Sequence, residues 1–277
     1  MSKTDPFIRW AGGKTWLLPY LQQIIGDTII EHYHEPFLGG GAVFFSLEHN
    51  KKAYLSDANP ELINTYIQVR DNPKDVLEYL STFKNTKEDY YRIRDHYQAQ
   101  YPEEEAARFI YLNQTSFNGL YRVNRQGKYN VPYGFRKNWT YECNRIIEAS
   151  KKLHNTNIVS GDFEVNKYRI KENDLVFLDP PYTVSHNHNG FIEYNKNLFS
   201  IEDQKRLNTF INYIKQKGPY YILTNAAHEA IFQIFDKEED RTIELPRKSL
   251  IGGKNSKRAE ITEYIFTNLK GGVFDGQ

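Results

Sequence analysis

Two patterns of hydrophobic residues alternate along this chain, one typical of β-strands and the other of α-helices. Their alternation predicts an α/β fold. Short, continuous apolar runs indicate buried strands, whereas apolar positions that recur every three or four residues indicate amphipathic helices. Residues 260–267 alternate apolar and polar side chains, which is typical of a strand with one buried face. Strands are predicted at residues 52–55, within 157–163, and at 175–178, 220–225 and 260–267, and helices at residues 15–25, 141–153 and 200–217.

The apolar run at residues 175–178 is the most informative, because it stops at Asp179, Pro180, Pro181 and Tyr182. Proline cannot donate to a sheet ladder, so the strand must end there. Asp179 is then held at the carboxyl end of a buried strand, where open α/β sheets bind their ligands. The Asp179 carboxylate and the Pro180 carbonyl suit an amino group with two N–H donors, and Tyr182 offers a face to a flat ring. A strand-ending turn with a surface aspartate is the alternative.

Two glycine-rich loops come earlier in the chain. Gly12 and Gly13 precede Lys14, but the spacing of a phosphate-binding loop is absent, so we expect only that they let the backbone approach a ligand. Residues 39–41 are all glycine and precede an apolar helix pattern, which predicts a strand–loop–helix unit with a ligand near the helix N-terminus. Asp57 follows 18 residues after the first of these glycines and is expected to bind ribose hydroxyls. The alternative for Asp57 is an N-cap of the next helix.

The α/β rhythm breaks at residues 71–150, where helical patterns dominate and an irregular stretch follows. Residues 125–128 are expected to form the tip of a β-hairpin, since polar turn residues with a glycine lie between two arms. Residues 117–152 contain eight Lys or Arg against two Glu, which leaves a net charge of +6 in a chain whose total is +1. A basic segment interleaved with Asn and aromatic residues suits nucleic acid, although a solvated basic face is the alternative. The helices are predicted at residues 73–80, 87–98 and 103–113.

Two further loops carry candidate chemistry. Residues 247–258 hold five basic residues and no acid, which indicates a second phosphate-contacting loop. His186 and His188 have the spacing of two metal ligands, but no acid or third histidine is placed to complete the set. We therefore expect no metal, and a loop over the active site instead.

Composition restricts the compartment and the chemistry. Cys143 is the only cysteine of the 277 residues, so neither an intramolecular disulfide nor a cysteine-based zinc site is possible. The N-terminus lacks the apolar core of a signal peptide, and no apolar run approaches the length of a membrane span. We expect a cytoplasmic protein that does not bind membranes.

Four motifs occur in an order that resembles one known family. They are Trp10-Ala11-Gly12-Gly13-Lys14, Glu35-Pro36-Phe37-Leu38-Gly39-Gly40-Gly41, Phe117-Asn118-Gly119-Leu120-Tyr121-Arg122-Val123-Asn124 and Asp179-Pro180-Pro181-Tyr182. Together they resemble the Dam-type (D12 class, α group) DNA adenine-N6 methyltransferases. The resemblance spans residues 7–268, and the four motifs in order are specific where each one alone is not.

The resemblance implies a Rossmann-like, seven-stranded methyltransferase sheet. It implies a catalytic domain formed by residues 1–70 and 151–277, with a helical and β-hairpin target-recognition insert at residues 71–150. S-Adenosylmethionine is the implied cofactor, without a metal, and the implied catalytic residues are Asp179, Pro180 and Tyr182. The implied cofactor-binding residues are Trp10, Lys14, Phe37, Gly39, Gly41, Asp57, Asp162, Phe163 and Asp179.

The same resemblance implies double-stranded DNA as the partner. Phe117 occupies the position of a wedge that fills the space of a flipped base, and Arg122 that of an arginine pairing with guanine. The chain departs from the family at Phe135, where many GATC-specific enzymes have an arginine, so GATC and other GA-containing sites both stay open. The implied DNA-binding residues are Arg9, Phe117, Asn118, Leu120, Arg122, Asn124, Arg125, Pro132, Arg136, Lys137, Lys254, Lys257 and Arg258.

Asp at the head of the Asp179 motif favours adenine over cytosine-N4 or glutamine methylation. RNA methylation, a DNA-binding protein without methylation activity and a plain Rossmann-like oxidoreductase are the rival hypotheses. We expect a monomer that acts either alone or beside a genetically linked restriction endonuclease for the same site.

Overall fold

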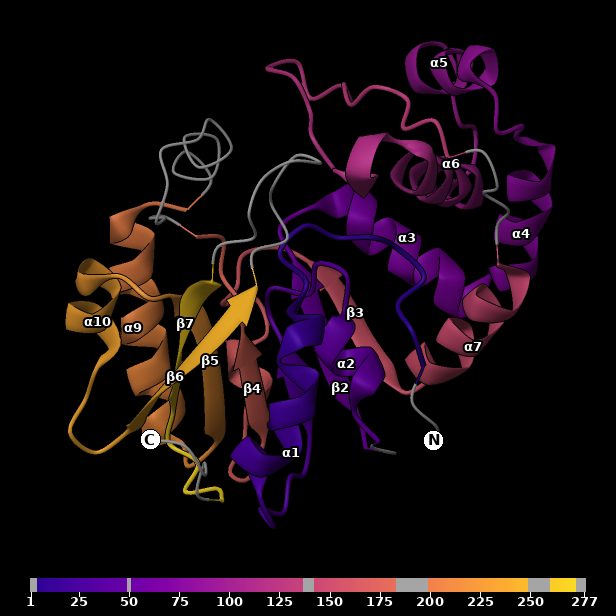
Figure 1. The fold of residues 1–277 in the computed structure, drawn as a ribbon. Coiled ribbons are helices and arrows are strands. Elements are labelled where there is room, and N and C mark those ends of the chain that lie inside the picture. Colours follow the sequence, from indigo (N-terminus) through magenta and orange to yellow (C-terminus); the bar gives the residue numbers. More distant parts are fainter. Residues whose placement is uncertain (1–3, 49–50, 137–141, 183–198, 249–259, 273–277) are drawn as a thin grey trace. The chain divides into compact units, whose positions relative to one another are not determined.

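The computed structural model describes residues 4–48, 51–136, 142–182, 199–248 and 260–272 (Figure 1). These residues divide into two compact units. The first contains residues 1–15, 38–51 and 55–163, and the second contains residues 16–37, 52–54 and 164–277. The expected division between a catalytic domain and an insert at residues 71–150 stays a prediction.

A seven-stranded sheet has the strand order β3-β2-β1-β4-β5-β7-β6. β4 is parallel to both β1 and β5, whereas β7 is antiparallel to β5 and to β6. The order confirms the predicted α/β fold and places β4 in the middle of the sheet. The strands are β1 (Tyr33–Glu35), β2 (Ala53–Asp57), β3 (Thr156–Ser160), β4 (Leu175–Leu178), β5 (Tyr220–Ala226), β6 (Arg241–Lys248) and β7 (Glu260–Thr267).

The central strand β4 is buried at every position, because it has a hydrogen-bonded neighbour on each side and its side chains all face protein. This explains why its sequence is a continuous apolar run. Pro180 and Pro181 end the strand, as expected from the missing N–H groups. Asp179 therefore lies at the carboxyl end of β4.

A buried carboxylate holds the opposite end of β4 beside β1. Asp174 is completely buried and accepts hydrogen bonds from His32 Nδ1 at 2.8 Å and His34 Nε2 at 2.9 Å. The main-chain N–H groups of His32 and Lys171 donate to the same carboxylate at 3.1 Å and 2.9 Å. Burial raises the pKa of Asp174, but the hydrogen bonds from His34, Lys171 and His32 outweigh it, and the net pKa lies below its usual value.

The second unit packs helices α9 and α10 against each other, and α9 against β5 (Figure 1). Ser200 forms a capping box with Asp203, which confirms the predicted start of α9. Helix α10 and strand β6 were not predicted. The helices of this unit are α1 (Leu18–Ile25), α9 (Ile201–Gln216) and α10 (Glu229–Phe235), with a short 3-10 turn at Lys167–Arg169.

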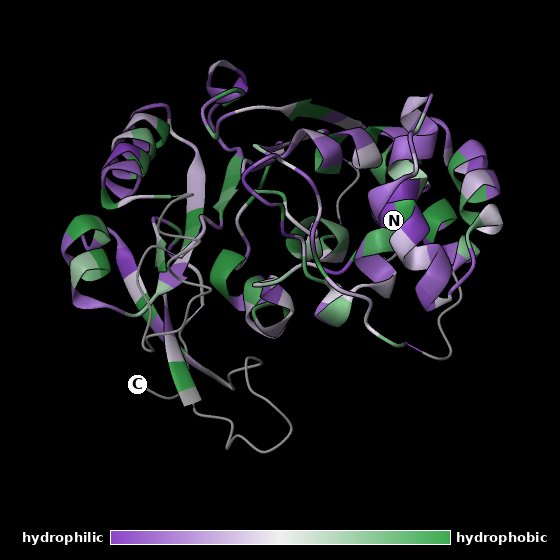
Figure 2. Cartoon of the chain, turned by 90° about the horizontal axis from the view of Figure 1, so that it is seen from above, coloured by the Kyte–Doolittle hydropathy of each residue, from purple (hydrophilic) through white to green (hydrophobic). Residues whose placement is uncertain are grey.

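The first unit contains most of the helical segment, in which α3 and α4 both pack against α6. Proline stands at the first position of α3, α4 and α6, where its missing N–H is tolerated. The helices are α2 (Ala42–Ser46), α3 (Pro60–Asp71), α4 (Pro73–Thr82), α5 (Lys87–Asp95), α6 (Pro102–Thr115) and α7 (Cys143–Leu153), with 3-10 turns at Lys14–Trp16 and Phe117–Gly119. Hydropathy colouring shows hydrophobic and hydrophilic faces on the same helices (Figure 2), which agrees with the periodic pattern of the sequence.

Two expectations about the irregular segments need correction. The expected turn at residues 125–128 is present, with an antiparallel bridge between Val123 and Tyr129, but its arms carry isolated bridges, this one and that between Ser116 and Tyr133, in place of continuous strands. Arg247 and Lys248, which we expected in a loop, belong to the end of β6. The rest of that loop and the segment with His186 and His188 lie outside the described residues.

Candidate functional site

The loop of three glycines leaves room for one tryptophan ring. Gly39 and Gly41 have φ values of 46° and 66°, a region that favours glycine. A Cβ atom on Gly39 would lie 2.7 Å from Trp10 Cδ1, and one on Gly40 would lie 2.9 Å from Trp10 Cβ. The Tyr66 hydroxyl donates to the Gly39 carbonyl at 3.0 Å and fixes the loop from the other direction. Trp10 and the glycine loop, two of the predicted motifs, are therefore in direct contact.

Asp57 is fixed to the same loop at the end of β2. Its Oδ2 accepts the Gly39 N–H at 2.9 Å, and its Oδ1 accepts the Asn59 N–H at 2.9 Å. Burial raises the pKa of Asp57, and the main-chain hydrogen bonds oppose part of this effect. The side chain that caps α3 belongs to Asn59, which accepts from Glu61 N and Leu62 N. The N-cap alternative for Asp57 is therefore wrong.

The turn after β3 lies beside the same strand end. Gly161 N–H donates to the Asp57 carbonyl at 3.0 Å. This hydrogen bond holds the turn, and with it the next residues Asp162 and Phe163, near the end of β2. The Asp162 side chain is exposed, whereas Phe163 is buried. The first unit thus brings Trp10, Gly39, Asp57 and the turn at Asp162 into one linked cluster.

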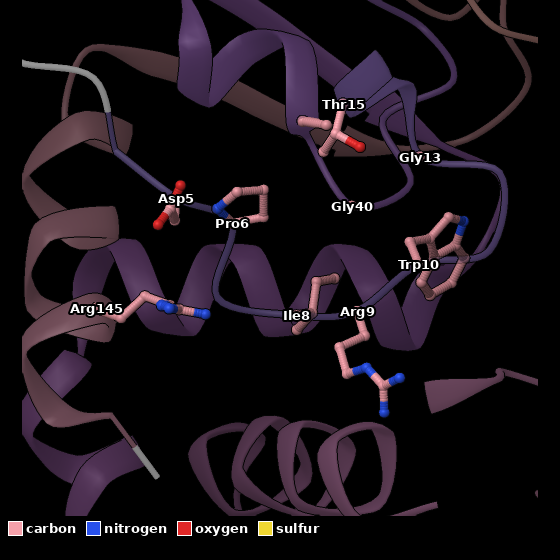
Figure 3. Close-up of a pocket in the computed structure, with 10 residues that line it drawn as sticks. Asp5, Pro6, Ile8, Arg9, Trp10, Gly13, Thr15, Gly40 and Arg145 are labelled. Atoms are coloured by element: carbon pink, nitrogen blue, oxygen red, sulfur yellow. The ribbon is translucent and has the colours of Figure 1, made fainter. Parts of the chain in front are cut away.

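A cavity of about 340 Å³ opens next to this cluster, within the size range of small-molecule sites (Figure 3). The cavity is lined by Trp10, Gly13 and Gly40 from the two glycine motifs. Arg9 and, from α7, Arg145 also line it. Lys14, Gly39, Gly41 and Asp57 are not among its lining residues. Lys14 is itself buried, and its Nζ donates to the Gly12 carbonyl at 2.9 Å.

In the second unit, Asp179 is half-buried at the end of β4, and its carboxylate has a protein donor. Thr224 Oγ1, completely buried on β5, donates to Asp179 Oδ1 at 3.0 Å. The parallel pairing of Leu178 with Leu223 places these two residues next to each other. Pro180, whose carbonyl is the second predicted acceptor, is buried. One carboxylate oxygen of Asp179 is therefore oriented by the neighbouring strand.

Tyr182 is anchored from β7. Its hydroxyl donates a hydrogen bond to Glu263 Oε2, and Glu263 is 1% exposed. The ring that we expect to stack on a flat substrate is thus fixed at its polar end. Phe37, the remaining predicted residue of this unit, makes an edge contact with Phe199 at a centroid distance of 5.6 Å.

Sequence reasoning missed Thr224 and Glu263, although each carries a signal. Thr224 stands near the carboxyl end of the strand beside β4, the edge where parallel sheets collect functional side chains. Glu263 is an acid on the same face of β7 as Ile261 and Ile265, where the alternation predicts apolar residues. A buried acid on an apolar face needs a partner, and Tyr182 is that partner.

The basic segment folds back on itself through a tight turn. Asn124 N–H donates to the Lys128 carbonyl at 2.8 Å, and Asn124 Oδ1 accepts the N–H groups of Gln126 and Lys128 at 2.9 Å and 3.0 Å. Part of the Asn124 side chain therefore stabilises the turn. Asn130 Oδ1 accepts from the exposed Arg122 through Nε at 2.7 Å, which orients the guanidinium.

The other predicted DNA contacts within the described residues lie in the first unit, and most of them are exposed. Phe117 is 52% exposed, and Asn118 has a φ of 55°. Leu120 is half-buried, whereas Arg125, Pro132 and Arg136 are exposed. Lys137, Lys254, Lys257 and Arg258 lie outside the described residues.

Arg9 joins this surface from the N-terminal segment. Asn113 clamps its main chain, accepting the Arg9 N–H at 2.8 Å and donating to the Arg9 carbonyl at 2.7 Å. A Cβ atom on Gly119 would lie 2.8 Å from the Arg9 side chain, so Arg9 packs on the turn that carries Phe117. Burial lowers the pKa of Arg9, and the nearby charge of Arg136 lowers it further.

Within the described ranges, no group of three or more His, Cys, Asp or Glu side chains could hold a metal ion. None of the described helices has the length and hydrophobicity needed to cross a membrane.

Comparison with known proteins gives a consistent result. Residues 10–248 match the family model of the D12 class N6 adenine-specific DNA methyltransferases. The chain is 38% identical to a Type II methyltransferase of Lactococcus lactis subsp. cremoris, over 95% of both chains. It is 35% identical to a Type II methyltransferase of Methanocaldococcus jannaschii, over 96% of this chain and 99% of the relative. A DNA adenine methylase of Serratia marcescens is 31% identical, over 75% of this chain and 77% of the relative.

Proposed function

This chain belongs to the D12 class of N6 adenine-specific DNA methyltransferases, and from that premise we propose that it methylates N6 of an adenine flipped out of a short duplex DNA site. The observation that carries the proposal is the pair of acceptors at the end of β4. Thr224 orients the Asp179 carboxylate, and the Pro180 carbonyl follows directly in the chain. Glu263 fixes the Tyr182 ring three residues beyond Asp179.

The chemistry follows from the electronic structure of adenine. The N6 lone pair is delocalised into the ring, so the amino group is a poor nucleophile. Asp179 and the Pro180 carbonyl accept both N6 hydrogens and favour a pyramidal nitrogen whose lone pair is directed at the methyl donor. Tyr182 stacks on the extruded base and holds it in position. Correct placement of the two reactants supplies a large part of the barrier reduction.

The first unit fits S-adenosylmethionine, which supplies an activated methyl group when it is bound. A carboxylate has about four acceptor positions, and main-chain N–H groups of Gly39, Asn59 and Ala58 act on those of Asp57. The remaining capacity suits a ribose hydroxyl. The exposed Asp162 suits the amino group of an adenine ring. The residues of this unit that we assign to donor binding are Trp10, Lys14, Gly39, Gly41, Asp57, Asp162 and Phe163, and from the second unit we assign Phe37 and Asp179.

DNA binding is assigned to the exposed basic surface of the first unit. Arg122 would pair with a guanine, and Phe117 would fill the space that the flipped adenine leaves. Arg9, Asn118, Leu120, Asn124, Arg125, Pro132 and Arg136 complete the contacts within the described residues. GATC or another GA-containing sequence is the proposed site, and the enzyme acts either alone or with a restriction endonuclease for the same sequence.

The test is methyl transfer from radiolabelled S-adenosylmethionine to duplexes with and without a GATC site, followed by nucleoside analysis. We expect N6-methyladenine with the wild-type protein and none with Asp179→Ala, which should still bind DNA. Asp27→Ala removes an exposed carboxylate elsewhere in the second unit and should keep full activity. Transfer by Asp179→Ala near the wild-type rate would remove Asp179 from catalysis.

A further inference from the structure

Phe135 combines two features that its edge contact with the Tyr133 ring, at a centroid distance of 5.0 Å, does not account for. Its side chain is 67% exposed, so its burial contributes little to the core. Its φ is 53°, in the left-handed region where a side chain is strained and glycine is favoured. Strained residues persist where the surroundings fix them, and they cluster at functional sites.

Hydrogen bonds fix the backbone turn at Phe135, both before and after this residue in the chain. Before it, the Tyr133 hydroxyl donates to Asn85 Oδ1 at 2.9 Å, and Gly134 N–H donates to the Thr115 carbonyl at 2.8 Å. After it, Asn85 Nδ2 donates to the Arg136 carbonyl at 2.6 Å. Asn85 thus ties residues 133 and 136 together, and the ring between them is presented in one orientation.

The turn at Phe135 also packs tightly on the segment that carries Phe117. A Cβ atom on Gly134 would lie 2.4 Å from the Ser116 carbonyl oxygen, so only glycine allows this approach. Phe117 N–H donates to the Pro132 carbonyl at 2.8 Å. Two segments that are paired with each other therefore each present an exposed ring, Phe117 at 52% and Phe135 at 67%.

The charge next to the ring indicates what it contacts. Arg136 follows Phe135 directly, and its guanidinium is held by the Gln114 carbonyl at 3.3 Å. Its charge acts on Arg9, so two cations lie near each other on this surface. A strained, exposed aromatic ring beside two arginines suits a polyanion with flat, stacked groups, which is nucleic acid.

We propose that Phe135 is a second wedge, whose ring inserts at a base step next to the target adenine and lowers the free energy needed to extrude that adenine. This inference rests on the proposed function and adds to it a residue that determines how the duplex is opened. Proteins that bend or open DNA insert apolar side chains in this way, and they unstack the step that they enter. Arg136 and Arg9 would then contact the phosphates of the opened segment.

Phe135→Gly separates this role from a structural one, because glycine removes the ring and also relieves the left-handed strain. We expect its melting temperature to stay within about 2 °C of the wild type. We expect kcat/KM on a fully paired duplex to fall roughly 5- to 150-fold, the effect of losing one stacking contact. Tyr101→Ala is the matched control, because Tyr101 is 61% exposed in the same unit and its side chain does not cap α6.

A second substrate tests the wedge itself. When the target adenine is mismatched, extrusion needs less free energy. The kcat/KM of Phe135→Gly should then be much closer to that of the wild type than it is on paired DNA. Fluorescence of 2-aminopurine at the target position should rise when the wild type binds, and the rise should be smaller with Phe135→Gly. An equal loss on matched and mismatched DNA would show an ordinary contact and overturn the wedge, and so would unchanged activity.

The two proposals fail in different ways. If the wild type transfers no methyl group to DNA, the proposed function is wrong, whereas the 2-aminopurine signal still tests Phe135. If the wild type methylates and Phe135→Gly equals it on paired DNA, only the wedge is wrong. A melting temperature lowered by many degrees in Phe135→Gly would indicate a structural role and contradict the inference.

Discussion

Thr224 makes one hydrogen bond whose removal should affect catalysis without removing any proposed catalytic group. Its hydroxyl donates to Asp179 Oδ1 at 3.0 Å from a completely buried position on β5. Thr224→Val keeps the β-branched shape and deletes the donor. Hydrogen bonds to charged groups contribute about 1.5–3 kcal/mol. If that energy orients Asp179 toward adenine N6, its loss should lower kcat roughly 10- to 150-fold.

The assay is steady-state methylation of a short duplex, with KM measured for both DNA and S-adenosylmethionine. We expect kcat to fall and both KM values to change little, because Thr224 acts through the orientation of Asp179. Thr242→Val is the control for the chemical change, since Thr242 Oγ1 on β6 also donates to an aspartate, Asp236 Oδ1 at 2.6 Å, but in an exposed position. It should leave kcat unchanged. A Thr224→Val enzyme with wild-type kcat would refute the positioning role.

Three further changes test other parts of the structure. Gly39→Ala places a Cβ atom 2.7 Å from Trp10 Cδ1 at a left-handed φ, so thermal denaturation should show a loss of about 2–4 kcal/mol and donor titration a weaker affinity. Asp174→Asn should destabilise by about 1.5–3 kcal/mol at neutral pH, because it weakens the hydrogen bonds that His32, His34 and Lys171 make to a buried carboxylate. Because the folded pKa of Asp174 is lowered, its stabilising contribution is present above the unfolded pKa of about 3.9 and is lost as pH falls through the still lower folded pKa. The urea midpoints of the wild type and Asp174→Asn should therefore differ more at pH 7 than at pH 2, and an equal difference at both pH values would contradict this. Arg122→Ala should reduce discrimination at one base pair by about 1–3 kcal/mol in competition between duplexes, and an unchanged site preference would remove Arg122 from base readout.

Much of the sheet could be predicted because its local patterns agree with its environment. The buried run before Asp179 matches β4, and the alternation at residues 260–267 matches β7 in both bounds. The capping pattern at Ser200 predicted the start of α9. In each case a local feature, such as apolar continuity, period two or a cap, was sufficient.

The parts that could not be predicted depend on contacts between distant residues. β1 has only three residues, and it pairs with β4 through partners about 140 positions away. Thr224 and Glu263 acquire their roles from Asp179 and Tyr182, which no local pattern connects to them. The turn at residues 125–128 was recognised from its glycine, but the arms form isolated bridges because side chains such as Asn124 satisfy part of the backbone.

The central claim is that this chain methylates adenine N6 in DNA at one short site. Single-molecule sequencing of DNA from a methylation-deficient host that expresses the protein tests this most directly. We expect N6-methyladenine at a single GA-containing motif, GATC or a related sequence, and none in a host that expresses Asp179→Ala. Well-expressed protein with no modified adenine in the host DNA would contradict the claim.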